Sequence, residues 1–347
     1  MKVAIRADAS AAIGLGHVKR CLALAHALRN SGATVTFQTR AIDVDAAALV
    51  RADGFAAIVI GAGQVSDQTI DAEESLHHPD AFADGLMVVD HYALDARWHG
   101  PVRDTSHAKI VAIDDLADRA LDVDLLVDHN LGDLAVKYAA RIGAQTIVLG
   151  GPRHALLGPG YATAPRHVPG AQVGSVGIFM GGTDAANVSA LALMACRLAE
   201  FDGPVEIATT SGNPNLPALR TLAGARLHTT LALDLPDLAA FFARHGLQIG
   251  AGGGATWERC CIGVPTLALI AAANQVPVLH PLHALGAVEL VDGDGDGALP
   301  GARQLAGRLA ALLADAPRRA TLSSRSRELV DGRGAARVAD HLMTLAP

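Results

Sequence analysis

Short apolar segments that end in polar residues or glycine recur along this chain, with helical stretches between several of them. In the first half they are KVAIRAD (2–8), TVTFQTR (34–40), AAIVIG (56–61), GLMVVDHY (85–92), KIVAIDD (109–115), DLLVDHN (124–130) and QTIVLGG (145–151). Such segments are typical of buried parallel strands, and their alternation with helices favours a doubly wound α/β fold.

This alternation breaks between residues 151 and 172, where four prolines occur, and restarts with VGIFMGG at residue 176. A chain of 347 residues is long enough for two domains, each with its own core. We therefore expect an N-terminal α/β domain over 1–160 and a C-terminal α/β domain over 161–347, whose last helix can pack back on the first. Two Rossmann-like domains of this kind would face a cleft, which is the default place for a ligand.

Composition excludes several classes of partner. A net charge of −7 and 3% aromatic residues argue against a nucleic-acid surface. No run of about 18 apolar residues occurs, so we expect no membrane-spanning helix and no stable membrane association.

Met1 leads directly into a strand without a signal-peptide pattern, which favours the cytoplasm. The spacing of the cysteines does not suggest a metal site, and we expect reduced thiols.

The stretch IGLGHVKR (13–20) places a histidine where a strand gives way to a helix. Downstream, apolar residues recur at helical spacing, so His17 is predicted in the first turn of that helix. Its helix N-terminus follows the carboxyl end of the first strand, the edge at which open α/β sheets bind ligands. A surface histidine in a turn is the alternative interpretation.

Three predicted strand-to-helix junctions are rich in glycine: IGLGH (13–17), MGGTD (180–184) and GAGGGATWE (250–258). Glycine lets the backbone approach a ligand closely, and helix N-termini favour phosphate groups. Three such loops at equivalent points of two α/β halves favour a ligand that carries a diphosphate.

Polar residues near these loops are further candidates. Glu258 could accept hydrogen bonds from ribose hydroxyls, although an acid in the first turn also suits the helix dipole. Asn274 and Gln275 follow the next strand, and the TSGNPN loop (210–215) either faces a ligand or forms a simple turn. The complete set of candidate substrate-binding and UDP-binding residues is Gly14, Gly16, Arg20, Gly181, Gly182, Thr183, Asp184, Ser211, Asn213, Gly252, Gly253, Gly254, Glu258, Asn274 and Gln275.

A dinucleotide site is a weaker possibility. The first loop has G-x-G-x-x-K in place of G-x-G-x-x-G, and the second strand ends in FQTR without an acid for the ribose. Arg40 in that segment could suit a 2′-phosphate, which leaves an NADP enzyme as an alternative.

Several segments, taken in order, resemble one enzyme family. They are RADASAAIGLGHVKR, VVDHY, AIDD, MGGTDAAN, TTSGNPN, GAGGGATWERCCIGVPTLAL and ANQ, which span about residues 2 to 276. Together they resemble the UDP-2,4-diacetamido-2,4,6-trideoxy-β-L-altropyranose hydrolases of pseudaminic acid biosynthesis. That family is similar in fold to the GT-B glycosyltransferases.

The resemblance implies hydrolysis of a UDP-sugar to the free diacetamido sugar and UDP, by metal-independent C–O cleavage without a cofactor. It implies that His17 and Tyr92 belong to the catalytic site, where Tyr92 could position water or an acetamido group. It also implies that the glycine-rich loops and Glu258 of the second half bind the nucleotide. We expect His17 to take a proton from the attacking water, and Asp8 to orient the imidazole or bind a sugar hydroxyl.

Two other functions are compatible with the same residues. A GT-B glycosyltransferase would use the same UDP site but would require an acceptor. A non-catalytic nucleotide-sugar-binding protein would bind UDP without turnover, and changing His17 would then have no effect on catalysis.

Overall fold

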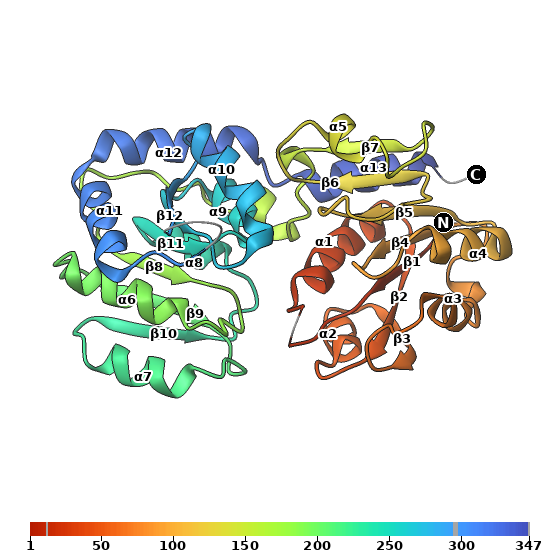
Figure 1. Ribbon diagram of the computed structural model, residues 1–347, viewed down its shortest axis with the longest axis horizontal. Helices are drawn as coiled ribbons and strands as arrows, with labels where there is room; N and C mark the ends of the chain where they lie inside the picture. Colours follow the sequence, from red (N-terminus) through yellow and green to blue (C-terminus); the bar gives the residue numbers. More distant parts are fainter. Residues whose placement is uncertain (12, 294–297, 346–347) are drawn as a thin grey trace. The chain divides into compact units, whose positions relative to one another are not determined.

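The computed structural model describes residues 1–11, 13–293 and 298–345. The chain forms two compact units, as Figure 1 shows. The first comprises Met1–Pro159 together with Gly332–Pro347, and the second comprises Gly160–Asp331. The proline-rich break expected between residues 151 and 172 therefore contains the first passage from one unit to the other.

The first unit is built on a seven-stranded parallel sheet in the order β3-β2-β1-β4-β5-β6-β7. Its strands are β1 (Lys2–Ala7), β2 (Thr34–Ala41), β3 (Ala56–Ala62), β4 (Leu86–Asp90), β5 (Lys109–Ile113), β6 (Leu125–Asp128) and β7 (Ile147–Gly150). Its helices are α1 (Gly16–Asn30), α2 (Ala46–Ala52), α3 (Gln68–Leu76), α4 (Ala96–Ser106), α5 (Leu134–Tyr138) and α13 (Gly334–Leu345), with short 3-10 turns η1 (Pro79–Ala81) and η2 (Pro152–His154).

Helices cover both faces of this sheet. On one face, α1, α2 and α13 bury alternate strand residues such as Val3, Ile5 and Val88. On the other, α3 and α4 pack over Ala4, Met87 and Val89, with the fully buried Trp98 in the same cluster. Because both faces of the central strands are buried, β4, β5 and β6 are largely apolar, and this is why they stood out in the sequence.

The second unit has a six-stranded parallel sheet in the order β10-β9-β8-β11-β12-β13. Its strands are β8 (Val176–Phe179), β9 (Val205–Thr209), β10 (Thr229–Leu233), β11 (Leu247–Ala251), β12 (Thr266–Leu269) and β13 (Glu289–Val291). Its helices are α6 (Val188–Leu198), α7 (Leu216–Gly224), α8 (Ala239–Arg244), α9 (Ala255–Ile262), α10 (Val276–Ala284), α11 (Ala302–Ala314) and α12 (Ala316–Leu329), with the turn η4 (Ala273–Gln275). The turn η3 (Pro159–Ala162) begins at the last residue of the first unit and continues into the second.

Strand order reverses once in each sheet. In the first unit, β2 and β3 lie on one side of β1 and the chain then returns to place β4 on the other side. In the second, β9 and β10 lie on one side of β8, and β11 lies on the other. The carboxyl edges of β1 and β4, and of β8 and β11, are therefore the switch points at which doubly wound sheets bind ligands.

The predicted fold class, two doubly wound Rossmann-like α/β domains, is confirmed by these sheets. Every strand predicted in the first half is present within a few residues of its expected bounds. The sequence analysis missed β10 and β13, which are short strands at the two edges of the second sheet. The last helix, α13, belongs to the first unit, where it packs on α1.

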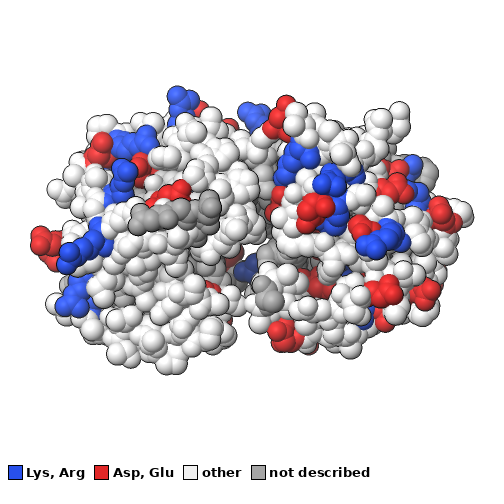
Figure 2. Space-filling view, viewed as in Figure 1, with Lys and Arg blue, Asp and Glu red and all other residues white. Residues whose placement is uncertain are grey.

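Charged side chains of both signs are interspersed on the face shown in Figure 2. None of the helices in the described ranges is both long and apolar enough to cross a lipid bilayer. All four cysteines are buried and free of disulfide bonds.

Candidate functional site

His17 lies at the switch point of the first unit. It occupies the first turn of α1, as the sequence predicts, and only 7% of its surface is exposed. Its Nδ1 lies 2.6 Å from Oδ1 of Asp90, the last residue of β4. Because β1 and β4 are neighbours, with Ala7 opposite Asp90, a loop that follows one strand meets the end of the other.

The Asp90 carboxylate accepts hydrogen bonds from several side chains. Besides His17, it accepts hydrogen bonds from Arg20 Nε and Nη2, each at 2.6 Å, and from the Cys21 thiol at 3.4 Å. Burial alone would raise the pKa of Asp90, but the positive charge of Arg20, together with the hydrogen bonds from Arg20 and His17, outweighs it and holds that pKa well below its ordinary range. Asp90 is therefore a fixed anion that orients the imidazole and leaves Nε2 for proton transfer.

Tyr92 packs against the imidazole. The two rings meet edge to face, with centroids 4.6 Å apart and an interplanar angle of 84°. Burial, followed by the negative charge of Asp115, raises the pKa of Tyr92, so the phenol stays protonated. Asp115 also lies 3.8 Å from Arg20, so Arg20, expected to bind substrate, forms ion pairs with Asp90 and Asp115.

Asp8 does not hold the imidazole, which corrects the orienting role expected for it. Its carboxylate accepts two hydrogen bonds from Arg6, at 2.6 and 2.9 Å, and one from the Arg40 backbone N–H at 2.8 Å. His91 Nε2 is 3.4 Å away. Burial opposes ionisation, but hydrogen bonding to His91 and the charge of Arg6 lower the pKa of Asp8. The carboxylate therefore ties β1 to β2 inside the sheet.

Arg40, the residue on which an NADP site would depend, is also occupied. Its guanidinium forms ion pairs with Asp71 and Glu74 and donates to the carbonyl oxygens of Ala62 and Gly63. These contacts fix the end of β2 and do not present Arg40 to a ligand phosphate.

The glycines of the first loop differ in what the fold requires of them. Gly14 has φ +74°, and its N–H donates to Ser10 O at 2.7 Å, so the turn before α1 needs a residue without a side chain there. Gly16 begins α1, and a Cβ added to it would meet no atom within 4 Å.

In the second unit, the loop after β8 leads into α6. Gly181 has φ +97°, and a Cβ on Gly182 would lie 3.1 Å from the Thr210 side chain. Asp184 is buried and accepts hydrogen bonds from the Val188 and Ser189 N–H groups at 2.8 and 2.9 Å. Asp184 therefore caps α6, whereas Thr183 beside it is exposed.

The loop after β9 is held mainly by its own contacts. Asn213 is buried; it donates to Thr209 Oγ1 at 2.8 Å and accepts from the Asn215 N–H. Ser211 is exposed, and its N–H donates to Asp234. Asn213 is accounted for by this turn, while Ser211 remains open to solvent.

Protein packing explains one of the three glycines after β11 but not the other two. A Cβ on Gly252 would lie 2.7 Å from Leu279 Cδ1, so packing against α10 requires glycine there. Gly253 and Gly254 are exposed, and a Cβ on either would meet nothing within 4 Å. The protein's own packing does not require these two glycines, and the open space above them suits the close approach of a ligand.

Gln275 and Glu258 flank this loop. Gln275 Oε1 accepts hydrogen bonds from the Gly252 N–H at 3.1 Å and the Ala271 N–H at 2.9 Å, which joins the ends of β11 and β12. Glu258 lies in the first turn of α9, and its charge contributes, after burial, to a raised pKa of Tyr161. Asn274 is exposed in η4.

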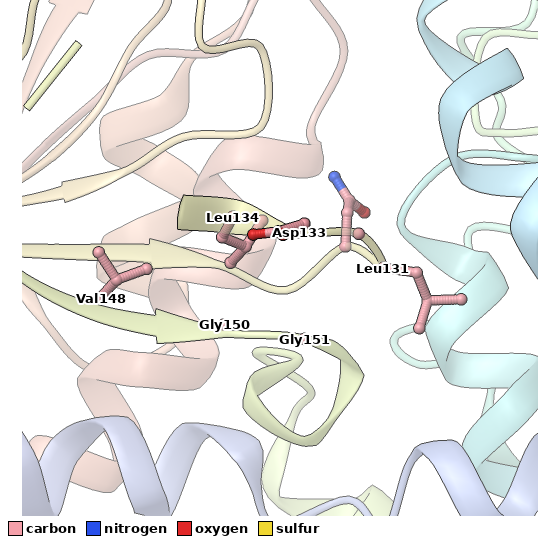
Figure 3. Close-up of a pocket in the computed structure, with 8 residues that line it drawn as sticks. Leu131, Asp133, Leu134, Val148, Gly150 and Gly151 are labelled. Carbon is pink, nitrogen blue, oxygen red and sulfur yellow. The ribbon is translucent and has the colours of Figure 1, made fainter. Parts of the chain in front are cut away.

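A separate pocket of about 370 Å³ lies at the carboxyl ends of β6 and β7. Figure 3 shows it at the start of α5, and its lining residues are Asn130, Leu131, Gly132, Asp133, Leu134, Val148, Gly150 and Gly151. None of the residues singled out in the sequence lines it. Within the described ranges, no group of three or more His, Cys, Asp or Glu side chains could hold a metal ion.

Comparison with known sequences gives distant relatives. No protein-family model matches the chain. The spore coat polysaccharide biosynthesis protein SpsG of Bacillus subtilis is 24% identical over 349 aligned positions, which cover 99% of this chain and 98% of that protein. The UDP-2,4-diacetamido-2,4,6-trideoxy-β-L-altropyranose hydrolase of Campylobacter jejuni is 26% identical over 240 residues, 69% of this chain and 80% of the relative.

Solved structures match over nearly the whole chain. MurG of Acinetobacter baumannii has a TM-score of 0.66 at 14% identity, covering 99% of this chain and 100% of that one. MnaA of Staphylococcus aureus with UDP has a TM-score of 0.66 at 12% identity, covering 99% of this chain and 97% of that one. The glycosyltransferase SnogD from Streptomyces nogalater has a TM-score of 0.60 at 16% identity, covering 99% of both chains. The chain has the GT-B fold.

The GT-B fold accounts for the positions of the candidate residues. His17 and Asp90 lie at the switch point of one Rossmann-like unit, and the loops 181–184 and 252–254 lie at the switch point of the other. The sequence analysis predicted the positions of His17 and of the loops, but it did not single out Asp90, which contacts His17. The available signal was the segment VVDHY, in which an acid ends a buried strand.

Proposed function

We propose that this chain is a nucleotide-sugar-processing enzyme, and that it hydrolyses UDP-2,4-diacetamido-2,4,6-trideoxy-β-L-altropyranose to the free sugar and UDP. The observation that carries the proposal is the hydrogen bond between His17 and Asp90 at a switch point. The Campylobacter jejuni relative, named as this hydrolase, supports the substrate. The UDP complex of the Staphylococcus aureus neighbour supports a uridine nucleotide.

In this reaction His17 is the general base. Its Nδ1–H donates to Asp90, so Nε2 can take a proton from water. The water oxygen then bonds to the anomeric carbon, and the bond from that carbon to the diphosphate oxygen breaks with its electron pair leaving on UDP. Such base assistance typically contributes about 10²- to 10⁴-fold in rate.

The other candidate residues act in binding. Tyr92, packed on the imidazole, positions the water or an acetamido group. In the second unit, the backbone N–H groups at Gly182, Gly253 and Gly254 receive the diphosphate, and Glu258 accepts from the ribose hydroxyls. Negative charge that builds on departing UDP is stabilised by such N–H groups and by helix dipoles.

A glycosyltransferase is the second candidate, and the structural neighbours favour it over the hydrolase. SnogD, named as a glycosyltransferase, aligns with 99% of this chain. In that reaction an acceptor hydroxyl takes the place of water, and His17 would deprotonate it. The fold is the same for both reactions, so an acceptor requirement distinguishes them.

The deciding measurement is UDP release from the diacetamido UDP-sugar, with a chelator present and no acceptor, by wild type and by His17→Asn. Asparagine can still hydrogen-bond to Asp90 but cannot act as the base. Rapid release by wild type and at least about a hundredfold slower release by a folded variant would support the hydrolase. Release only after an acceptor is added would support the glycosyltransferase. UDP binding without turnover in either condition would support a binding protein.

A further inference from the structure

Arg259 places a buried guanidinium beside the loop that follows β11. It projects from α9, and only 1% of its surface is exposed. Nη2 donates to Ala251 O at 2.6 Å and to Thr256 Oγ1 at 3.2 Å. The guanidinium therefore contacts residues on both sides of the loop Gly252–Gly254.

Arg259 forms no ion pair in the described part of the chain, although the charge of Glu258, the preceding residue, acts on it. Its Nε and Nη1 have no hydrogen-bond acceptor, and none of the ion pairs found in the second unit includes it. The nearest aromatic face is that of Phe242, 5.9 Å from the guanidinium carbon. Burial lowers the pKa of Arg259 to about 10, so the group is still cationic at neutral pH.

The backbone is shaped to hold this cation. A Cβ on Gly250 would collide with Nη1, so glycine at this position leaves room for the guanidinium. Gly250 pairs with Phe179, the last residue of β8. Arg259 therefore lies beside the paired ends of β11 and β8, the two strands that carry the loops 252–254 and 181–184.

A second buried arginine in the same unit shows the contrast. Arg319 on α12 is also 1% exposed, but its guanidinium donates to four carbonyl oxygens, those of Leu312, Leu313, Gly170 and Ala171. Arg319 thus holds the C-terminal end of α11 and the segment at Gly170 and Ala171 through these hydrogen bonds. A buried charge without such compensation is costly to the free protein and is stabilised when an anion approaches.

We propose that Arg259 is a positioning residue for a diphosphate: its charge attracts the anion to the loops after β8 and β11, and its hydrogen bonds hold Gly252–Gly254 in place. The inference rests on the proposed function, since UDP is the ligand considered. It extends that function by assigning Arg259 a role in binding the diphosphate. This role is the same whether water or an acceptor attacks the sugar.

The test compares equilibrium binding of uridine, UMP and UDP, by calorimetry, to wild type, Arg259→Met, Arg259→Lys and Arg319→Met. We expect Arg259→Met to weaken UDP by about 10- to 100-fold and uridine by less than about threefold, the size expected for one interaction with a charged group. Arg259→Lys keeps the charge and retains most of the preference for UDP. Arg319→Met leaves the ratio of UDP to uridine affinity unchanged and lowers only the melting temperature.

Equal weakening of uridine and UDP by Arg259→Met would overturn the inference, because a purely structural role affects all three ligands alike. If the methionine variant does not fold, a folded Arg259→Lys that loses the preference for UDP overturns it in the same way. Binding of UDP with the expected ratios, but without turnover, would contradict the proposed reaction and leave the inference standing. A wild type that binds neither UDP nor uridine would contradict both.

Discussion

His17 Nδ1 and Asp90 Oδ1 lie 2.6 Å apart although 73 residues separate them in sequence. The contact exists because β1 and β4 are neighbours across the point where the strand order reverses. It gives the imidazole a fixed orientation and tautomer, as a carboxylate partner does for a histidine base.

Replacing Asp90 by asparagine tests this pair. Asp90→Asn preserves shape but removes the anion that fixes the tautomer, so we expect kcat to fall by about 10²- to 10⁴-fold with a smaller change in KM. Steady-state kinetics on the folded variant measure this. A kcat within about threefold of wild type would show that the pair is only structural.

Asp8→Asn is the matched control, since Asp8 follows β1 as Asp90 ends β4. Its carboxylate pairs with Arg6 and is fully buried. Breaking that pair should lower the free energy of unfolding by about 3 kcal/mol, measured with urea, because it leaves a buried arginine with less negative charge around it. Turnover by the folded fraction should be unchanged. A stable but inactive Asp8→Asn would instead place Asp8 in contact with the sugar.

Stability should fall in acid because of His99. This side chain on α4 is fully buried, and neither ring nitrogen has a partner in the described part of the chain. Burial, aided by the charge of Arg119, lowers its pKa from 6.5 to about 4. The unfolded chain therefore binds more protons between these values, so the free energy of unfolding decreases as pH falls from about 6.5 to 4, by about 3 kcal/mol in total.

His99→Leu isolates this contribution. The difference in unfolding free energy between variant and wild type, measured at pH 7 and pH 4, should shift by about 3 kcal/mol in favour of the variant. A constant difference across this range would mean that His99 is protonated in the folded protein without cost.

The glycines after β11 provide a pair of variants with opposite effects. Gly252→Ala forces a Cβ against Leu279 and should destabilise the free protein. Gly253→Ala meets open space, so the melting temperature should hold or rise slightly, while UDP affinity should fall by about tenfold because the added methyl group occupies ligand space. Thermal unfolding with and without UDP measures both. Unchanged UDP affinity in Gly253→Ala would mean that the ligand does not approach this loop.

Local sequence signals were sufficient to place His17 in the first turn of α1. A strand, two glycines and an amphipathic helix follow one another within the first 30 residues, and each is readable from spacing alone. The acid that holds His17 could not be read in that way. It depends on which strands are neighbours, and a single sequence gives no strand order. Asp8 was predicted to orient the imidazole because it is close to His17 in sequence. In the structure the Asp8 carboxylate binds the backbone of β2, and Asp90 at the end of β4 contacts the imidazole.

The segment GAGGG shows a second limit. Its glycines look alike in sequence, yet Gly250 leaves room for Arg259, Gly252 for Leu279, and Gly253 for nothing in the protein itself. Arg259 was not among the residues predicted from the sequence, because an arginine on an amphipathic helix is ordinarily solvated. The edge strands β10 and β13 were missed since a short or half-exposed strand has neither a continuous apolar run nor clean alternation.

The return of α13 to the first unit has a consequence for the order in which the protein can fold as it is synthesised. The second unit is one continuous stretch and can bury its core as soon as residue 331 has left the ribosome. The first unit begins the chain but is completed by its end, because Val338, Ala339 and Leu342 cover the apolar face of α1. The helix that carries His17 is therefore among the first segments made and among the last to be enclosed.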